Sequence, residues 1–260
     1  MTIPQNRRGI SRAMSDGESK LTVLGHLHEL RRRIIKSAIA VAIGVIICFF
    51  FYDWIFYILK RPAAGITFSA IEMTENISSI MLVCFAGGVI LAMPVLVYHG
   101  IMFVAPALTP QEKKWVYIII PWIFLMFLAG VAFGYFMLAP WTIWFLYNFG
   151  SNIAEMFPRI SHYIGFLTKL LLLTGFVFEM PVISTFLARL GLLKPEWLSG
   201  KRPIFIILAF IMAAVITPPD PITQVLLAIP LILLYEMSIG LAKLVYPKKG
   251  EAVEELPLES

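Results

Sequence analysis

Three acidic residues stand where the surrounding sequence is basic or apolar, and their chemistry suits a cationic ligand. Glu29 lies in a basic stretch before the first long apolar run, Glu112 in a short basic loop after the second, and Glu179 deep inside the fourth. A carboxylate can accept two parallel hydrogen bonds from one guanidinium group, so Glu29 and Glu112 suit arginine as a ligand. An acid near the middle of a membrane is costly to hold there and usually marks a functional site.

Each acid also has an interpretation that needs no ligand. Glu29 can form an intrahelical pair with Arg32 or Arg33, which follow it by three and four residues. Glu112 can be an acid in the first turn of the third membrane helix, where the helix dipole favours it. Glu179 can be a protonated structural residue or bond to a neighbouring helix. The residues alone leave both interpretations open.

The stretch 24–35 predicts an amphipathic helix at the membrane surface. Its apolar residues recur at steps of three and four, so they share one helix face. Most of its polar and basic residues fall off that face, toward anionic headgroups. The apolar residues are Leu24, Leu27, Leu30 and Ile34.

The composition is that of an integral membrane protein. Of the 260 residues, 59% are hydrophobic and 14% charged, and the mean hydropathy is +0.84. The net charge of +5 does not indicate a nucleic-acid partner, because the basic residues cluster beside apolar runs. Cys48 and Cys84 both lie inside apolar runs and read as small buried hydrophobes. No phosphate-binding, zinc-protease or serine-hydrolase motif occurs, so we expect no enzyme activity, catalytic residue, cofactor or metal site.

Apolar runs predict an all-α protein with six transmembrane helices. We expect a disordered cytoplasmic tail over 1–20, a membrane domain over 21–246 and a polar cytoplasmic tail over 247–260. The fifth run would span only ~20 Å, so either the bilayer thins around it or loop residues extend it. The tight turn after it contains Asp220, a predicted N-cap of the sixth helix. The predicted spans are about 34–58, 80–104, 115–138, 163–187, 204–216 and 222–241.

Basic residues predict the orientation. Seventeen Lys and Arg residues fall in the two tails and the second and fourth connections, against three in the other connections. Because cytoplasmic segments carry the excess of Lys and Arg, both termini are expected in the cytoplasm.

Five ordered motifs resemble one known family, over about residues 24–246. They are His26-Leu27-x-Glu29-Leu30-Arg31-x-Arg33, Phe103-Val104-Ala105-Pro106-Ala107-Leu108 followed by Glu112, Phe178-Glu179-x-Pro181, Lys201-Arg202-Pro203 and Thr217-Pro218-Pro219-Asp220. Each motif alone is weak, but the ordered set is specific. The set resembles TatC, the multi-span subunit of the twin-arginine protein translocase.

The resemblance implies a glove-shaped six-helix receptor in the bacterial cytoplasmic membrane, with short fifth and sixth helices. It would bind twin-arginine signal peptides of folded proteins and assemble, in several copies, with single-span TatA- and TatB-type proteins. The proton motive force would drive export. We weigh this against a proton-coupled secondary transporter of a small solute, with Glu179 as its site; such transporters usually contain repeated halves, and no repeat is visible.

The resemblance also implies roles for individual residues. Glu29 and Glu112 match the acids that receive the signal arginines, and Arg31 and Phe103 match neighbouring functional positions. Pro62 matches a functional position in the first external loop. Glu179 matches the membrane acid implicated in contacts with partner helices.

Overall fold

The computed structural model describes residues 7–104, 110–149, 157–217 and 220–246, without the side chains of 7–24, 26, 104 and 110–117. This part of the chain is helical, with one isolated β-bridge between Ser69 and Arg159. In order, the elements are α1 (Arg7–Phe50), α2 (Tyr52–Lys60), the short 3-10 helix η1 (Arg61–Ala63), α3 (Glu75–Val104), α4 (Pro110–Phe133), the π-helical turn η3 (Gly134–Leu138), α5 (Ala139–Asn148), α6 (Ile160–Arg189), α7 (Pro195–Gly200), α8 (Arg202–Ile216) and α9 (Pro221–Val245).

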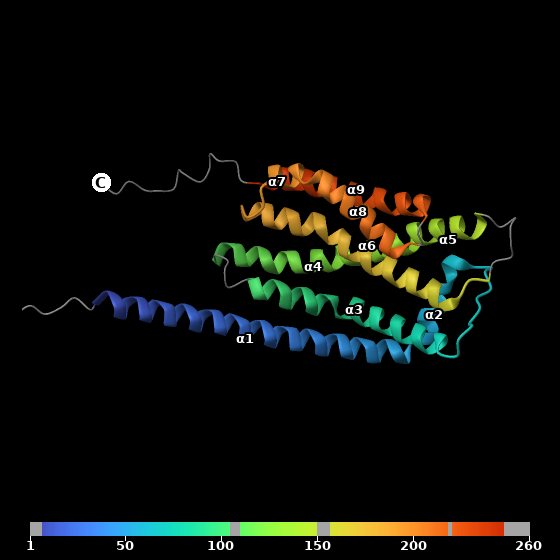
Figure 1. The fold of residues 1–260 in the computed structure, drawn as a ribbon, viewed down its shortest axis with the longest axis horizontal. Coiled ribbons are helices and arrows are strands. Elements are labelled where there is room, and N and C mark those ends of the chain that lie inside the picture. The colour runs from blue at the N-terminus through green and yellow to red at the C-terminus, as the bar shows by residue number, and fades with distance from the viewer. Residues whose placement is uncertain (1–6, 105–109, 150–156, 218–219, 247–260) are drawn as a thin grey trace, which may run out of the picture.

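Five helical stretches are long and apolar enough to cross a membrane. They are Leu27–Phe50, Glu75–Phe103, Ile118–Asn148, Ile160–Arg189 and Pro221–Val245. The sixth apolar helix, α8, has 15 residues and would cover ~22 Å. Figure 1 shows that α8 ends short of the level that α5 reaches.

Three helical stretches differ from the expectations. The third span, expected over about 115–138, continues through η3 and α5 to Asn148. α9 has 25 residues, so the expectation of a short sixth helix is wrong; Pro230 lies inside it without ending it. Neighbouring helices can accommodate such a proline in a membrane. α1 begins at Arg7, within the segment expected to be a disordered tail, and no proline interrupts the chain between Pro4 and Pro62.

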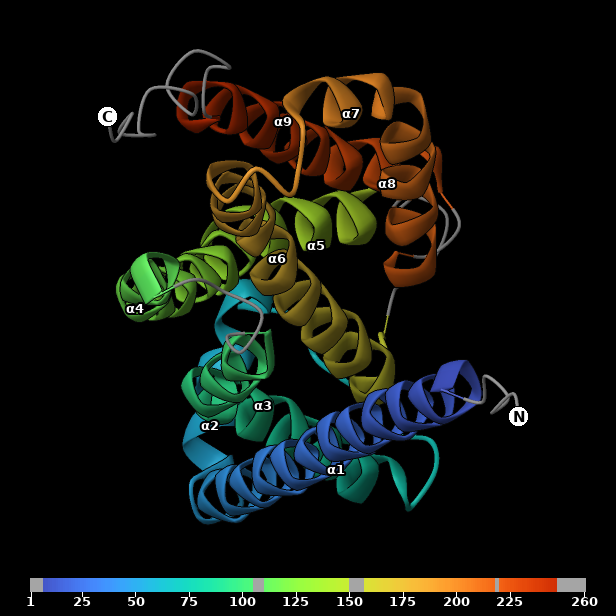
Figure 2. The same ribbon diagram turned by 90° about the vertical axis from the view of Figure 1, so that its left-hand side faces the viewer.

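The first apolar run bends where no proline or glycine marks it. α1 ends at Phe50, Phe51 has non-helical angles, and α2 follows in a new direction (Figure 2). Two tyrosine hydroxyls hold α2 by its carboxyl end: Tyr163 donates to the carbonyl of Leu59 at 2.6 Å and Tyr135 to that of Ile58 at 2.7 Å. The carbonyl of Ile58 also accepts from the backbone amide of Arg61. Both carbonyls lie in the last turn of α2, where a helix runs short of its own donors and lipid supplies none.

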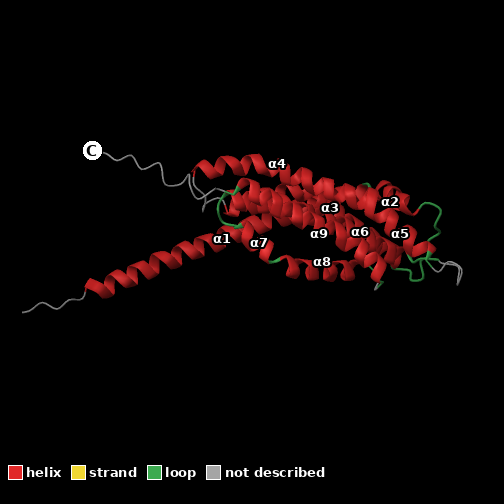
Figure 3. Cartoon of the chain, turned by 90° about the horizontal axis from the view of Figure 1, so that it is seen from above, coloured by secondary structure: helices red, strands yellow, loops and turns green. Residues whose placement is uncertain are grey.

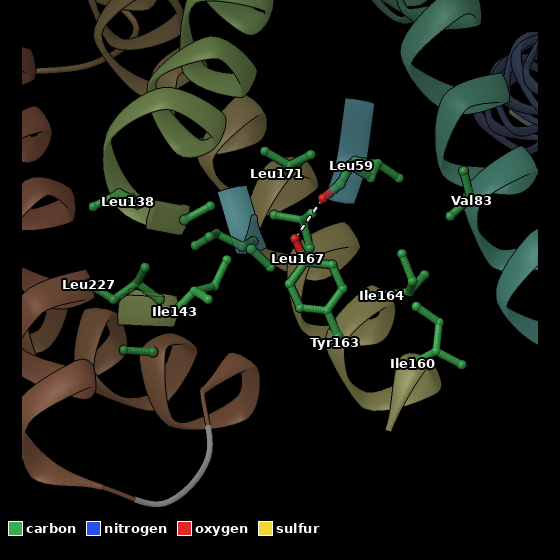
Figure 4. Packing of buried hydrophobic residues seen from close by; sticks show 14 residues of the cluster. Leu59, Val83, Leu138, Ile143, Ile160, Tyr163, Ile164, Leu167, Leu171 and Leu227 are labelled. Carbon is green, nitrogen blue, oxygen red and sulfur yellow. Dashed lines mark hydrogen bonds between the residues drawn. The ribbon is translucent and has the colours of Figure 1, made fainter. Parts of the chain in front are cut away.

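α6 runs through the middle of the bundle. It packs against α4 and α9 and also contacts α3, while α1 packs along α3 (Figures 1 and 2). Figure 4 shows the packing around Tyr163, where side chains from α2, α3, α5, α6 and α9 meet. In Figure 3 the first part of α1 extends away from the other helices.

Glycines allow the closest helix approaches. A Cβ at Gly44 of α1 would lie 2.7 Å from the carbonyl oxygen of Gly88 in α3. A Cβ at Gly130 of α4 would lie 2.5 Å from the carbonyl oxygen of Thr174 in α6. Any larger residue would push these helices apart, because the atoms that it meets are backbone.

An ion-pair cluster ties the loop before α3 to the start of α6. Arg159 donates through Nε to Glu75 at 2.7 Å and through Nη2 to Glu72 at 3.2 Å. The backbone amides of Ser69 and Ile160 donate to the carbonyls of Pro158 and Ser69, at 3.1 and 3.0 Å. The Glu75 side chain is only 4% exposed, so Arg159 neutralises a buried acid. Its hydrogen bonds to these acids raise the pKa of Arg159.

We predict that Arg159→Gln destabilises the protein. Removing one partner leaves Glu75 buried without its cation, so the temperature of unfolding should fall. Thermal unfolding of the detergent-solubilised protein measures this. Arg61→Gln is the matched control, since Arg61 is exposed in η1 and its guanidinium group donates to the Tyr57 hydroxyl at 3.4 Å rather than to an acid. The prediction would be contradicted if the Arg159→Gln and Arg61→Gln variants unfolded at the same temperature. It would also be contradicted if Glu75→Gln, added to Arg159→Gln, restored none of the lost stability.

Candidate functional site

Glu29 is already paired within α1. Arg33 donates to its Oε1 through Nε at 2.9 Å and through Nη2 at 2.5 Å. The Glu29 side chain is 36% exposed and that of Arg33 22%. This is the intrahelical pair that the sequence offered as the alternative to a ligand. The pair does not prevent Glu29 from binding another cation, because exposed ion pairs at this spacing are weak and exchange with competing ions.

A basic hollow of about 280 Å³ surrounds this pair, between α1 and α3. Its charged lining carries three cations against one acid. Two residues from α3 complete it, Tyr98 and His99, which the sequence analysis did not place in the site. His99 precedes Phe103 by four residues, so the two share one face of α3. This helical spacing was the one sequence signal that could have predicted His99 near the site. The lining residues are Glu29, Arg32, Arg33, Lys36, Tyr98 and His99.

The other residues that the resemblance implies for signal-peptide binding lie at the same end of the bundle as Glu29. Arg31 is exposed on α1 and lines a second surface hollow beside Arg32 and Lys36. Phe103 is partly buried in the last turn of α3. The backbone of Glu112 lies in the first turn of α4, as the alternative interpretation predicts, and its side chain is outside the described residues. The structure therefore brings Glu29 to the end of α3 and leaves its relation to Glu112 untested.

Glu179 is a buried acid in the central helix. It is 3% exposed, and neither carboxylate oxygen has a hydrogen-bond partner in the described part of the chain. It lies one turn after Gly175, which packs directly on the ring of Phe127 in α4. A carboxyl group so placed is stable when it is neutral or when another molecule supplies a donor.

Apolar hollows lie along α4, α6 and α9, and Glu179 is not among the residues that line them. One of about 430 Å³ runs toward Arg189 and Val245, and another of about 600 Å³ runs toward Trp141. Phe178, next to Glu179 in sequence, lines both hollows together with Leu234 and Met237 of α9. Together they form one long apolar surface, here called the α9 groove. An exposed apolar surface of this size suits a hydrophobic chain or helix.

The two candidate loop residues have structural positions. Pro62 lies within η1, directly after α2. Asp220 caps α9: its Oδ1 accepts from the amide of Thr223 at 2.7 Å, and its Oδ2 accepts from the Thr223 hydroxyl. The predicted N-cap is confirmed. Among the described residues, no three His, Cys, Asp or Glu side chains gather as they would around a metal ion.

Known proteins resemble this chain over most of its length. Residues 25–230 match the family model of the Sec-independent protein translocase protein TatC. The chain is 40% identical to that protein from Desulforapulum autotrophicum, covering 95% of this chain and 93% of the relative. It is 39% identical to that of Aquifex aeolicus, covering 87% and 96%. A crystal structure of the twin-arginine translocase receptor TatC matches with a TM-score of 0.78 and 38% identity, over 85% of this chain and 99% of that chain.

Proposed function

The chain belongs to the TatC family, and we propose that within the twin-arginine translocase it is the receptor for signal peptides and the platform on which partner helices assemble. It is a multi-pass membrane subunit of a Sec-independent protein translocase. The observation that carries the proposal is similarity along nearly the whole chain, in sequence and in fold, to proteins of that name. The alternative of a small-solute transporter finds no support in these relatives.

We place six helices across the bacterial cytoplasmic membrane, in a glove-shaped bundle, with both termini in the cytoplasm. The five long helices and α8 would be the six crossings. The start of α4, α7 and the end of α9 lie at the same end of the bundle as the first part of α1 (Figure 1). The excess of basic residues at this end supports a cytoplasmic location.

We predict that a thiol-reactive probe unable to cross membranes distinguishes Phe157→Cys from Trp197→Cys. The two native side chains are similarly exposed, at 61% and 59%, and lie at opposite ends. The Phe157→Cys variant should react in intact cells, and Trp197→Cys only after permeabilisation. The native Cys48 and Cys84 are buried and should give little background. A reversed labelling pattern would refute the orientation.

Receptor function rests on carboxylates that exchange cationic partners. Glu29 borders the basic hollow, and its bonds to the guanidinium group of Arg33 support a role in binding arginine. We assign Glu112 as a second acid at this end of the protein. Consecutive arginines of a signal peptide would bind one acid each, and lysine would bind less well because it lacks the planar fork. Arg31 and Phe103 are proposed to shape the surrounding surface.

We predict that Glu29→Gln and Glu112→Gln each weaken binding of an Arg-Arg signal peptide about tenfold. Each variant removes one charge-assisted interaction worth about 1.5–3 kcal/mol. Because both acids act on one ligand motif, the double variant should lose less than the sum. Fluorescence titration of the purified full chain in nanodiscs measures this, with a Lys-Lys peptide as ligand control.

Glu196→Gln is the control variant for this titration, because Glu196 is an exposed acid of α7, at the same end of the bundle. It should bind the Arg-Arg peptide as the unmodified protein does. Wild-type affinity in both single variants of the proposed acids would show that they are not the receptor site.

Partner assembly is proposed to use the α9 groove. A single-span TatA- or TatB-type helix would lie on its apolar lining, and a polar group of that helix would hydrogen-bond Glu179. The unpartnered carboxylate supports this, since its burial is favourable only when a donor is supplied or the group is neutral. We also propose that the assembled complex contains several copies of each subunit. The proton motive force would drive export. Pro62 is proposed to be a functional residue on the external side of the membrane.

We predict that Glu179→Ala lowers site-specific crosslinking between Met237 of the α9 groove and a partner helix severalfold, while signal-peptide affinity stays unchanged. The matched control is Ser184→Ala on the same helix: Ser184 is also buried, and its hydroxyl donates to the carbonyl of Pro181 at 3.2 Å. Crosslinking that remains at the wild-type level in Glu179→Ala would exclude this acid from the partner contact.

A further inference from the structure

The acid proposed to receive a signal arginine is not empty in the free protein. Arg33 directs two donors of its guanidinium group at Oε1 of Glu29, at 2.9 and 2.5 Å. An arriving arginine binds a carboxylate best through both of its oxygens, and Arg33 already occupies Oε1. A ligand therefore has to exchange with Arg33 for Oε1.

We propose that Arg33 is an internal competitor that occupies Glu29 until a signal peptide displaces it, and so sets the affinity of the receptor. This inference rests on the proposed function of Glu29. Arg33 resembles the ligand group itself, because it offers the same guanidinium fork to the same carboxylate.

The position of Arg33 suits reversible occupation. Its side chain is 22% exposed and that of Glu29 36%, so solvent reaches both and exchange requires no opening of the core. The pair is one helical turn long, a spacing at which ion pairs are marginally stable. Occupation of Glu29 by Arg33 is therefore partial, and a competing arginine can replace it.

Neighbouring cations make it harder for a ligand to displace Arg33 from Glu29. Arg32 and Lys36 line the same hollow, and neither forms an ion pair with Glu29 among the described residues. A displaced Arg33 guanidinium would stay near these cations, so displacement brings like charges together. The signal peptide must overcome this repulsion, which discourages isolated basic side chains from filling the site.

A competitor has a kinetic signature that other roles lack. If Arg33 blocks Glu29 for part of the time, its removal raises the association rate for every cationic ligand by the same factor and leaves the dissociation rate unchanged. If Arg33 instead orients Glu29 or touches the peptide, its removal raises the dissociation rate and weakens binding.

The test compares Arg33→Gln with Arg32→Gln, in the full chain in nanodiscs, by stopped-flow binding of Arg-Arg and Lys-Lys signal peptides. Both variants remove one positive charge from the same hollow, but only Arg33→Gln frees Glu29. We expect Arg33→Gln to bind both peptides about two- to fourfold more tightly than Arg32→Gln does, through faster association. Arg33→Lys should show a smaller gain, because lysine competes without the planar fork.

A Glu29→Gln background separates this inference from the proposed function. There the gain from Arg33→Gln over Arg32→Gln should vanish, since the contested carboxylate is gone. Equal binding by the two arginine variants in the native background, or weaker binding by Arg33→Gln, would overturn the competitor role while the receptor role stands. Unchanged peptide binding by Glu29→Gln alone would overturn both.

Discussion

The close approach of α4 and α6 is the constraint on which the rest of the bundle depends. Lipid tails are as apolar as leucine, so helices in a membrane associate through tight packing rather than through the hydrophobic effect. Gly130 and Gly134 remove the side chains that would separate α4 from Thr174 of α6. With α4 held there, α6 still has faces for α3 and α9. One turn beyond this contact lies Glu179, which the same approach shields from lipid.

Two buried acids show how the same residue type can serve structure or await a partner. Glu75 is buried against Arg159, which joins two segments distant in sequence; their pairing accounts for the presence of the acid. Glu179 is equally buried and forms no ion pair or well-formed hydrogen bond among the described residues, although the backbone amide of Phe127 lies nearby. The first acid has its compensation inside the chain. The second suits a site whose compensation comes from another molecule or from a proton.

The sequence predicted what depends on local chemistry. Apolar length located the long helices, and the Asp-Pro pair located the cap at Asp220. It did not predict the break at Phe51, where neither proline nor glycine stands. The two tyrosines that hold the far end of α2 come from η3 and α6, which are distant in sequence. The predicted sixth span, 222–241, already crossed Pro230, and α9 continues through it from Pro221 to Val245.

The candidate site was likewise predicted from the sequence only in part. The pairing of Glu29 with a following arginine was foreseeable from spacing, and the structure selects Arg33 over Arg32. Tyr98 and His99 enter the basic hollow through the packing of α3 on α1, which no motif encodes. The side chain of Glu112 lies outside the described residues, so its meeting with Glu29 stays a prediction.

As the sixth membrane crossing proposed above, the short helix α8 would have an electrical consequence. Its 15 residues cover ~22 Å, whereas a bilayer core measures ~30 Å. Where lipid adapts to α8, the same transmembrane voltage falls over about three-quarters of the usual distance. The electric field is then steeper by roughly a third beside α8 than elsewhere in the membrane. A charged group crossing there would feel a larger force per ångström, on the flank of the bundle where α8 meets α9.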